Sequence, residues 1–194
     1  MAQQRVGSGR ANALREGWKL QSRVEETSRA PVEVVYDVLS DLRTHLVWGG
    51  ERQKNNTRIL TLQAPEGPAS VGTEFATTGA DPMGRFTDRS VVTEASRPNT
   101  FEFVTEARLE TKKGKVIDWM LVHRYELSPA REGTRISYTG RITRISELAG
   151  PLAMFRIPGL RSLAMRASAG VSRRGVRNLA RLAEERAGRG TRVR

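Results

Sequence analysis

The sequence contains no cysteine and only two histidines, His45 and His123. The absence of cysteine excludes a disulfide scaffold, thiolate metal ligands and a cysteine nucleophile. With two histidines, a zinc site would take most of its ligands from carboxylates, so we expect no metal and no cofactor. No apolar run approaches the roughly 18 residues that span a bilayer. Residues 1–10 lack the apolar stretch of a secretory signal, so we expect a cytoplasmic protein.

Acidic residues are fewer than basic ones, and the imbalance is concentrated at one end. The 194 residues include 33 Lys plus Arg and 21 Asp plus Glu, a net charge of +12. Residues 150–194 hold eleven arginines, no lysine and two glutamates, so most of the excess lies in the last quarter of the chain. A basic segment of this kind favours an anionic partner, while the nearly neutral body resembles an ordinary globular domain.

The first 50 residues predict a strand followed by two short helices. Apolar and polar side chains alternate over 18–26, which is typical of a strand. Pro31 suits the first turn of a helix, and the apolar spacing over 32–39 is helical. Ser40 and Asp41 indicate a break, with Asp41 as the N-cap of a second short helix that Gly49 and Gly50 end.

The middle of the chain predicts six further strands joined by turns rich in Gly, Pro and Asn. These strands are expected at 57–63, 71–78, 85–94, 101–110, 116–127 and 134–145. Because the connections are short, neighbouring strands should pair as antiparallel hairpins. After Pro151 and Pro158, residues 160–186 repeat apolar side chains at helical spacing, with arginines on the opposite side.

This order of elements predicts an α+β fold in which a curved seven-stranded antiparallel sheet wraps around the long C-terminal helix. One face of the sheet needs a cover, and the last helix is the only element long enough to provide it. Two short helices cannot fill the concave side, so a hydrophobic pocket between sheet and helix is expected.

Strand alternation indicates which side chains face that pocket. The strand 116–127 places Trp119, Leu121, His123 and Tyr125 on one face, opposite Asp118 and the other charged residues. By the same alternation and the helical spacing, the expected ligand-binding residues are Phe101, Phe103, Trp119, Leu121, His123, Tyr125, Tyr138, Gly140, Leu163 and Ala167. Gly140 leaves room either for a neighbouring side chain or for a ligand.

The pattern from Ala30-Pro31 through Tyr36, Asp41 and Trp48, followed by Val71-Gly72-Thr73 and a closing amphipathic helix, resembles the SRPBCC superfamily. That group includes START-type lipid carriers, the birch-pollen allergen family and polyketide cyclase/dehydrase-like proteins. The resemblance covers roughly residues 17–187 and implies the helix-grip fold and a cavity for a hydrophobic or amphipathic small molecule. It supplies no shared catalytic residues.

Three residues are weak catalytic candidates: His123, Tyr125 and Tyr138. An inward imidazole can act as an acid or base, or donate to a ligand carbonyl. The alternative for His123 is a core histidine bonded to a neighbouring hydroxyl. His45, beside Arg43, is expected to be a surface or hinge residue. Asp118 and His123 face opposite ways, which argues against a Ser-His-Asp hydrolase.

The leading function hypothesis is therefore binding or transport of a lipid-like or polycyclic hydrophobic molecule. One alternative is a cyclase/dehydrase-like enzyme that uses inward His and Tyr residues, and another is a basic module that docks on membrane or nucleic acid. The arginines on the last helix are Arg166, Arg173, Arg174, Arg177 and Arg181. A solvated helix face is the first explanation for them, an anionic membrane surface the second, and nucleic acid, for which no motif is present, the last.

The expected organisation is a disordered arm at 1–16, one domain at 17–187 and a basic disordered tail at 188–194.

Overall fold

The computed structural model describes residues 20–53, 57–146 and 157–191, with only the backbone of 158–165, 167, 168, 190 and 191 described. Its strands are β1 (Leu20–Ser28), β2 (Arg58–Gln63), β3 (Glu74–Ala80), β4 (Gly84–Ser96), β5 (Thr100–Thr111), β6 (Val116–Ala130) and β7 (Gly133–Ile145). Its helices are α1 (Val32–Ser40), α2 (His45–Trp48) and α3 (Pro158–Thr191), with 3-10 turns η1 (Leu42–Thr44) and η2 (Glu51–Gln53).

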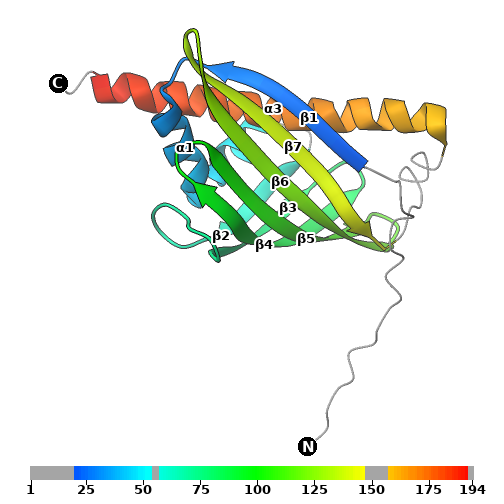
Figure 1. Ribbon diagram of the computed structural model, residues 1–194. Helices are drawn as coiled ribbons and strands as arrows, with labels where there is room; N and C mark the ends of the chain where they lie inside the picture. Colours follow the sequence, from blue (N-terminus) through cyan, green and yellow to red (C-terminus); the bar gives the residue numbers. More distant parts are fainter. Residues whose placement is uncertain (1–19, 54–56, 147–156, 192–194) are drawn as a thin grey trace, which may run out of the picture.

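The seven strands form one antiparallel sheet in the order β1-β7-β6-β5-β4-β3-β2. The sheet curls around α3, and the short helices lie near one end of it (Figure 1). This arrangement is the helix-grip fold, so the expected fold class is confirmed. The connections between β2 and β7 are short hairpins, which explains why sequence neighbours are also neighbours in the sheet.

The strand expected at 71–78 begins later, at Glu74. Gly72 has a φ of +87°, a left-handed conformation that favours glycine, and the Thr73 amide donates to the Ser70 carbonyl over 3.0 Å. These residues form a tight turn before the strand, so β-rich composition alone overestimated its length.

The expected break between the first two helices is confirmed, but the expected cap is not. α1 ends at Ser40, and the Asp41 side chain makes no capping hydrogen bond. Its carboxylate instead accepts a hydrogen bond from Arg186 of α3 over 3.2 Å. The Asp41 carboxylate therefore ties the α1–η1 corner to the last helix.

The C-terminal half of α3 holds the sheet and short helices together. Val176, Leu179, Ala180 and Ala183 are buried on its inner side. The side chain of Asn178 donates from Nδ2 to two backbone carbonyls, those of Trp48 and Arg52, each over 3.2 Å. α3 continues to Thr191, four residues beyond the expected domain end at 187. The expected arm at 1–16 and the last three residues of the expected tail lie outside the described residues.

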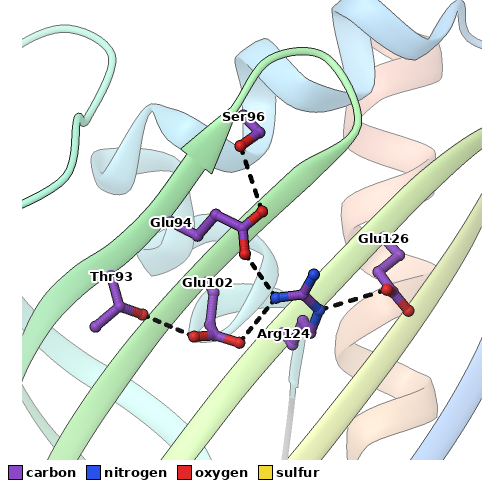
Figure 2. Close-up of polar contacts among 6 residues, drawn as sticks. All are labelled: Thr93, Glu94, Ser96, Glu102, Arg124 and Glu126. Atoms are coloured by element: carbon purple, nitrogen blue, oxygen red, sulfur yellow. Dashed lines mark hydrogen bonds and ion pairs between the residues drawn. The ribbon is translucent and has the colours of Figure 1, made fainter.

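On the outer face of the sheet, Arg124 connects three strands (Figure 2). Its guanidinium lies 2.7 Å from Glu94 of β4, 3.1 Å from Glu102 of β5 and 3.4 Å from Glu126 of its own strand. The hydrogen bonds that Arg124 donates to these carboxylates raise its pKa. A shared, half-buried arginine loses less side-chain entropy per contact than three separate surface pairs, so this network stabilises the register of β4 to β6.

The model contains no helix, over the residues it describes, that is long and apolar enough to cross a membrane.

We predict that Asn178→Asp strongly destabilises the fold. The substitution places a buried carboxylate oxygen against two carbonyl oxygens and removes both donors, which should lower the free energy of unfolding by about 3 kcal/mol. Urea unfolding followed by circular dichroism measures the change. Arg174→Ala on the exposed side of the same helix is the control and should change stability by no more than about 0.5 kcal/mol. Equal effects of the two substitutions would contradict this role of Asn178.

Candidate functional site

The inner face of the sheet carries two separate groups of packed apolar side chains. The first cluster lies where α1, α2 and α3 meet the sheet and includes Leu39, Trp48, Phe101, Phe103 and Tyr125. The second cluster consists of Phe86, Leu109, Ile117 and Ile145, with Met83, Trp119 and Ile142 packed against it. Strands β4 to β7 contribute residues to both clusters, which lie towards opposite ends of these strands on the same face of the sheet.

Between the clusters lies what we call the inner band: Thr77, Asp88, Ser90, Thr105, Ala107 and Leu121. Strand register places them together in two cross-strand rows. Thr77, Asp88 and Ala107 are paired neighbours on β3, β4 and β5, and Ser90, Thr105 and Leu121 form the adjacent row. The hydroxyls of Ser90 and Thr105 are 2.9 Å apart. Apart from Leu121, the inner band is therefore a strip of small and polar side chains between two apolar regions.

The expected ligand-binding residues fall into two groups by exposure. Phe101, Phe103, Tyr125 and Tyr138 are buried in the first cluster. Trp119, Leu121 and His123 keep part of their surface exposed although they face inward. The side chains of Leu163 and Ala167, the remaining expected pair on α3, lie outside the described residues. The alternation predicted for β6 is confirmed, with Asp118 exposed on the opposite face.

Gly140 is explained by a neighbouring side chain. A Cβ at this position would lie 2.6 Å from the Tyr138 hydroxyl oxygen and 3.3 Å from Oγ of Ser22. The sequence left open whether Gly140 makes room for a neighbouring side chain or for a ligand. The structure supports the neighbouring side chain. Gly140 contributes to the site indirectly, because it lets the Tyr138 hydroxyl fold back towards β6.

His123 and Tyr138 form a hydrogen-bonded pair on adjacent strands. His123 Nδ1 lies 3.0 Å from the Tyr138 hydroxyl oxygen. Ser172 of α3 also hydrogen-bonds to that hydroxyl, and this contact partly offsets the effect of burial on the Tyr138 pKa. When Tyr138 donates to Nδ1, the proton of the neutral His123 ring is on Nε2. The neighbouring hydroxyl expected for a core histidine is thus present, and it occupies one of the two ring nitrogens.

The pair is neutral at physiological pH. Burial lowers the pKa of His123 to about 3, with a smaller contribution from His45. Burial also raises the pKa of Tyr138. The His123 ring stacks on Phe103 at a centroid distance of 4.4 Å and an interplanar angle of 15°. An uncharged imidazole held in this way is an oriented hydrogen-bond donor or acceptor.

His45 is a core residue, and its assignment to the surface or a hinge was wrong. It is only 2% exposed, and its ring lies 4.6 Å from Trp48 and 5.8 Å from Phe75, centroid to centroid. Its Nε2 donates to the Leu39 carbonyl over 3.0 Å. Burial lowers the pKa of His45 to about 4. The apolar residues that enclose it come from α2, β3 and β5, far apart in sequence, so local charge around Arg43 gave the wrong indication.

Asp88 is the residue that sequence reasoning missed. Its carboxylate lies on the inner face, where Oδ2 accepts a hydrogen bond from Thr77 Oγ1 over 3.3 Å. Its other oxygen, Oδ1, is buried without a hydrogen-bond partner. Burial raises the pKa of Asp88 to about 7, partly offset by the Thr77 contact. The alternation of Phe86, Asp88, Ser90 and Val92 along β4 was the available signal, because it puts a carboxylate on the apolar face.

The arginines of α3 are divided between two roles. Arg177 and Arg173 pair with Glu26 of β1, at 3.0 and 3.8 Å, and so help to hold the helix on the sheet. Arg166, Arg174 and Arg181 are exposed and, within the described part of the chain, have no ion pair. Among the five arginines expected to form the basic face, these three are therefore the ones that the described contacts leave for an external partner.

Two shallow depressions lie on the outer face, away from α3. Their volumes are about 880 and 650 Å³, and they share Gln63, Ala76, Arg89 and Glu106. Charged and polar residues predominate in the larger depression and make up half of the smaller one. The lining of the larger depression also includes Thr77, Asp88, Ala107 and Trp119, whose side chains belong to the inner face. Over the same described residues, no group of three or more His, Asp or Glu is placed to hold a metal ion.

The sequence matches one family model, that of polyketide cyclase/dehydrase and lipid transport proteins, over residues 19–184. The chain belongs to this family. Its members are cyclases, dehydrases and lipid transport proteins, whose ligands are hydrophobic small molecules. No protein of curated function matches the sequence.

Solved structures similar to this chain share its fold at low sequence identity. A protein from Rhizobium leguminosarum is 13% identical with a TM-score of 0.61, covering 87% of this chain and 96% of that one. A protein from Chromobacterium violaceum is 15% identical with a TM-score of 0.56, covering 84% and 96%. DynU16, from the dynemicin biosynthetic locus, is 17% identical with a TM-score of 0.51, covering 84% of this chain and 47% of that one. At such identities the similarity establishes the fold alone.

We predict that Asp88→Asn stabilises the protein increasingly as the pH rises. The carboxyl pKa is about 7 in the folded chain and 3.8 in the reference state, so the unfolded chain loses its proton first. Wild-type stability should therefore fall between pH 4 and 7, by about 1.4 kcal/mol per unit of pKa difference as an upper limit. The asparagine variant avoids this loss. Urea unfolding of both proteins at pH 5 and pH 8 measures the stability gained by the substitution. A gain no larger at pH 8 than at pH 5 would contradict the prediction.

Proposed function

We propose that this protein binds and carries a hydrophobic or amphipathic small molecule against the inner face of its sheet, beneath α3. The observation that carries the proposal is the separation of the two apolar clusters by the inner band. A core packed only for stability would join them. Here, the inward side chains of Trp119, Leu121 and His123 keep exposed surface at that point. Membership of a family that handles hydrophobic small molecules supports the same function.

The His123–Tyr138 pair provides orientation for the polar end of such a ligand. Nδ1 is occupied by Tyr138, and in the tautomer in which Tyr138 donates to Nδ1, Nε2 carries the ring proton and can donate to a carbonyl or ether oxygen. The partly exposed ring of Trp119 offers flat apolar surface to the ligand body, while the buried Phe103 ring holds the imidazole in place by stacking on it. One oriented donor beside apolar walls is the pattern of a small-molecule binding site.

Carriage fits the chemistry of this pair better than acid–base catalysis. A proton-transferring group is most effective when its pKa is near the working pH. The pKa of His123, about 3, and the raised pKa of Tyr138 both lie far from neutrality. In a cyclase/dehydrase-like enzyme, the second candidate function, His123, Tyr125 and Tyr138 would polarise a carbonyl by hydrogen bonding.

We predict that Leu121→Ser weakens binding of the neutral fluorescent probe N-phenyl-1-naphthylamine by roughly fivefold. The substitution removes apolar surface from the proposed site, and fivefold corresponds to about 1 kcal/mol. Val122→Ser is the matched control, because Val122 is the next residue of β6, is similarly half-buried and faces the outer side. Fluorescence titration measures both affinities. Equal losses in the two variants would place the probe elsewhere and contradict the proposal.

We further propose that Arg166, Arg174 and Arg181 bring the protein to an anionic membrane surface. These three exposed side chains occupy one side of α3, the helix that covers the proposed site. Each basic residue near an anionic bilayer contributes about 1 kcal/mol of attraction. Contact between α3 and the membrane would bring the binding site of such a carrier close to apolar molecules dissolved in the bilayer.

We predict that replacing these three arginines with alanine lowers binding to vesicles containing anionic phosphatidylserine by roughly tenfold or more. Co-sedimentation measures the bound fraction, with phosphatidylcholine vesicles as the neutral comparison. The matched control replaces Arg85, Arg135 and Arg141, which are exposed on the outer face of the sheet and carry the same charge. If both triple variants lose binding equally, net charge and not the helix surface is responsible.

A further inference from the structure

We propose that Asp88 is the polar anchor of the inner-face site and selects ligands that carry a hydroxyl group, whose proton is donated to Asp88 Oδ1. This inference rests on the proposed function above, because it assigns the chemistry of a ligand at the same site. It adds a residue and a ligand class that neither the fold nor the family specifies.

One oxygen of the Asp88 carboxylate lacks a hydrogen-bond donor, and a ligand could supply it. Thr77 Oγ1 donates to Oδ2, while Oδ1 is buried and unpaired. A buried oxygen without a donor destabilises a fold by about 1–3 kcal/mol. The nearby hydroxyls of Ser90 and Thr105 are engaged with each other. Within the described inner band, Oδ1 is thus the acceptor that lacks a donor.

The neighbours of Asp88 define where the body of the ligand would lie. Along one cross-strand row, Asp88 of β4 pairs with Ala107 of β5, which pairs with Trp119 of β6. Strands are about 4.8 Å apart, so the Asp88 and Trp119 backbones are separated by about 10 Å with only a methyl group between them. A ring system placed over Ala107 would contact the partly exposed indole and bring a ring hydroxyl to Oδ1.

Charge complementarity favours a hydroxyl over the other possible donors. The inward positions of β3 to β6 carry no lysine or arginine, so an anionic ligand would meet the carboxylate without compensation. An ammonium group has three protons to place, and the site offers one unpaired oxygen. A hydroxyl has a single proton, which Oδ1 satisfies. An uncharged apolar molecule with a phenolic or alcoholic hydroxyl is therefore the ligand class.

The ionisation of Asp88 is consistent with this role. Its pKa of about 7 reflects burial of the carboxylate with too few hydrogen bonds. A hydroxyl donated to Oδ1 would stabilise the charged form and lower that pKa.

The test compares two probes that share a ring system, 2-naphthol and 2-methoxynaphthalene, by isothermal titration calorimetry at pH 8. The wild-type protein should bind 2-naphthol roughly tenfold more tightly, because only the hydroxyl can donate to Oδ1. Equal affinities, or a preference for the methoxy compound, would overturn the role of Asp88 while leaving the inner-face site intact. Failure of both probes to bind would overturn the proposed function as well.

Two variants test whether the preference for 2-naphthol depends on Asp88. Asp88→Leu should abolish the preference for 2-naphthol and keep the affinity for 2-methoxynaphthalene. Asp118→Leu removes an exposed carboxylate from the outer face of β6 and should keep the preference. Loss of the preference in both variants would overturn the assignment.

A measurement on the wild-type protein keeps the proposal testable even if Asp88→Leu does not fold. Carbon-detected NMR of protein labelled at the aspartate side-chain carboxyls follows the titration of Asp88. Saturating 2-naphthol should lower its pKa, and 2-methoxynaphthalene should not. An Asp88 titration unchanged by bound 2-naphthol would overturn the proposal.

Discussion

The architecture depends on the grip of the curved sheet on the C-terminal half of α3. Val176, Leu179, Ala180 and Ala183 bury an apolar stripe against the first cluster, and Glu26 of β1 pairs with Arg173 and Arg177 from the side. Because β1 pairs with β7 and the strands from β2 to β7 are joined in sequence within one sheet, this one contact fixes the helix relative to the whole sheet. It also determines where the inner face is covered tightly and where inward side chains remain partly exposed.

The two faces of β6 make different kinds of contact, and neighbouring residues of the strand point to opposite faces. His123 faces inward, hydrogen-bonds to Tyr138 and stacks on Phe103. Arg124, the next residue, faces outward and joins three glutamates. The outer network maintains strand register independently of what occupies the inner face. The strand can therefore carry a polar, incompletely packed inner surface without losing its pairing.

Much of the fold was predictable because its signals are local. Alternation on β6 and the helical spacing of α1 and α3 follow from the sequence period, and the hairpin turns contain Gly, Pro and Asn at the required places. His45 was misassigned because its burial depends on Phe75 and Phe103, which come from later strands. Asp88 was missed for a related reason: a carboxylate in a strand suggests solvent, and only tertiary packing shows that its Oδ1 is enclosed.

The described polar contacts of α3 tie together parts of the chain that are far apart in sequence. These ion pairs and side-chain hydrogen bonds involve residues of α3 from Ser172 to Arg186. Their partners include Glu26 of β1, Tyr138 of β7 and Asp41 at the α1–η1 corner. Because Ser172 contacts the hydroxyl that His123 also contacts, the orientation of the His123–Tyr138 pair is coupled to the seating of α3 on the sheet.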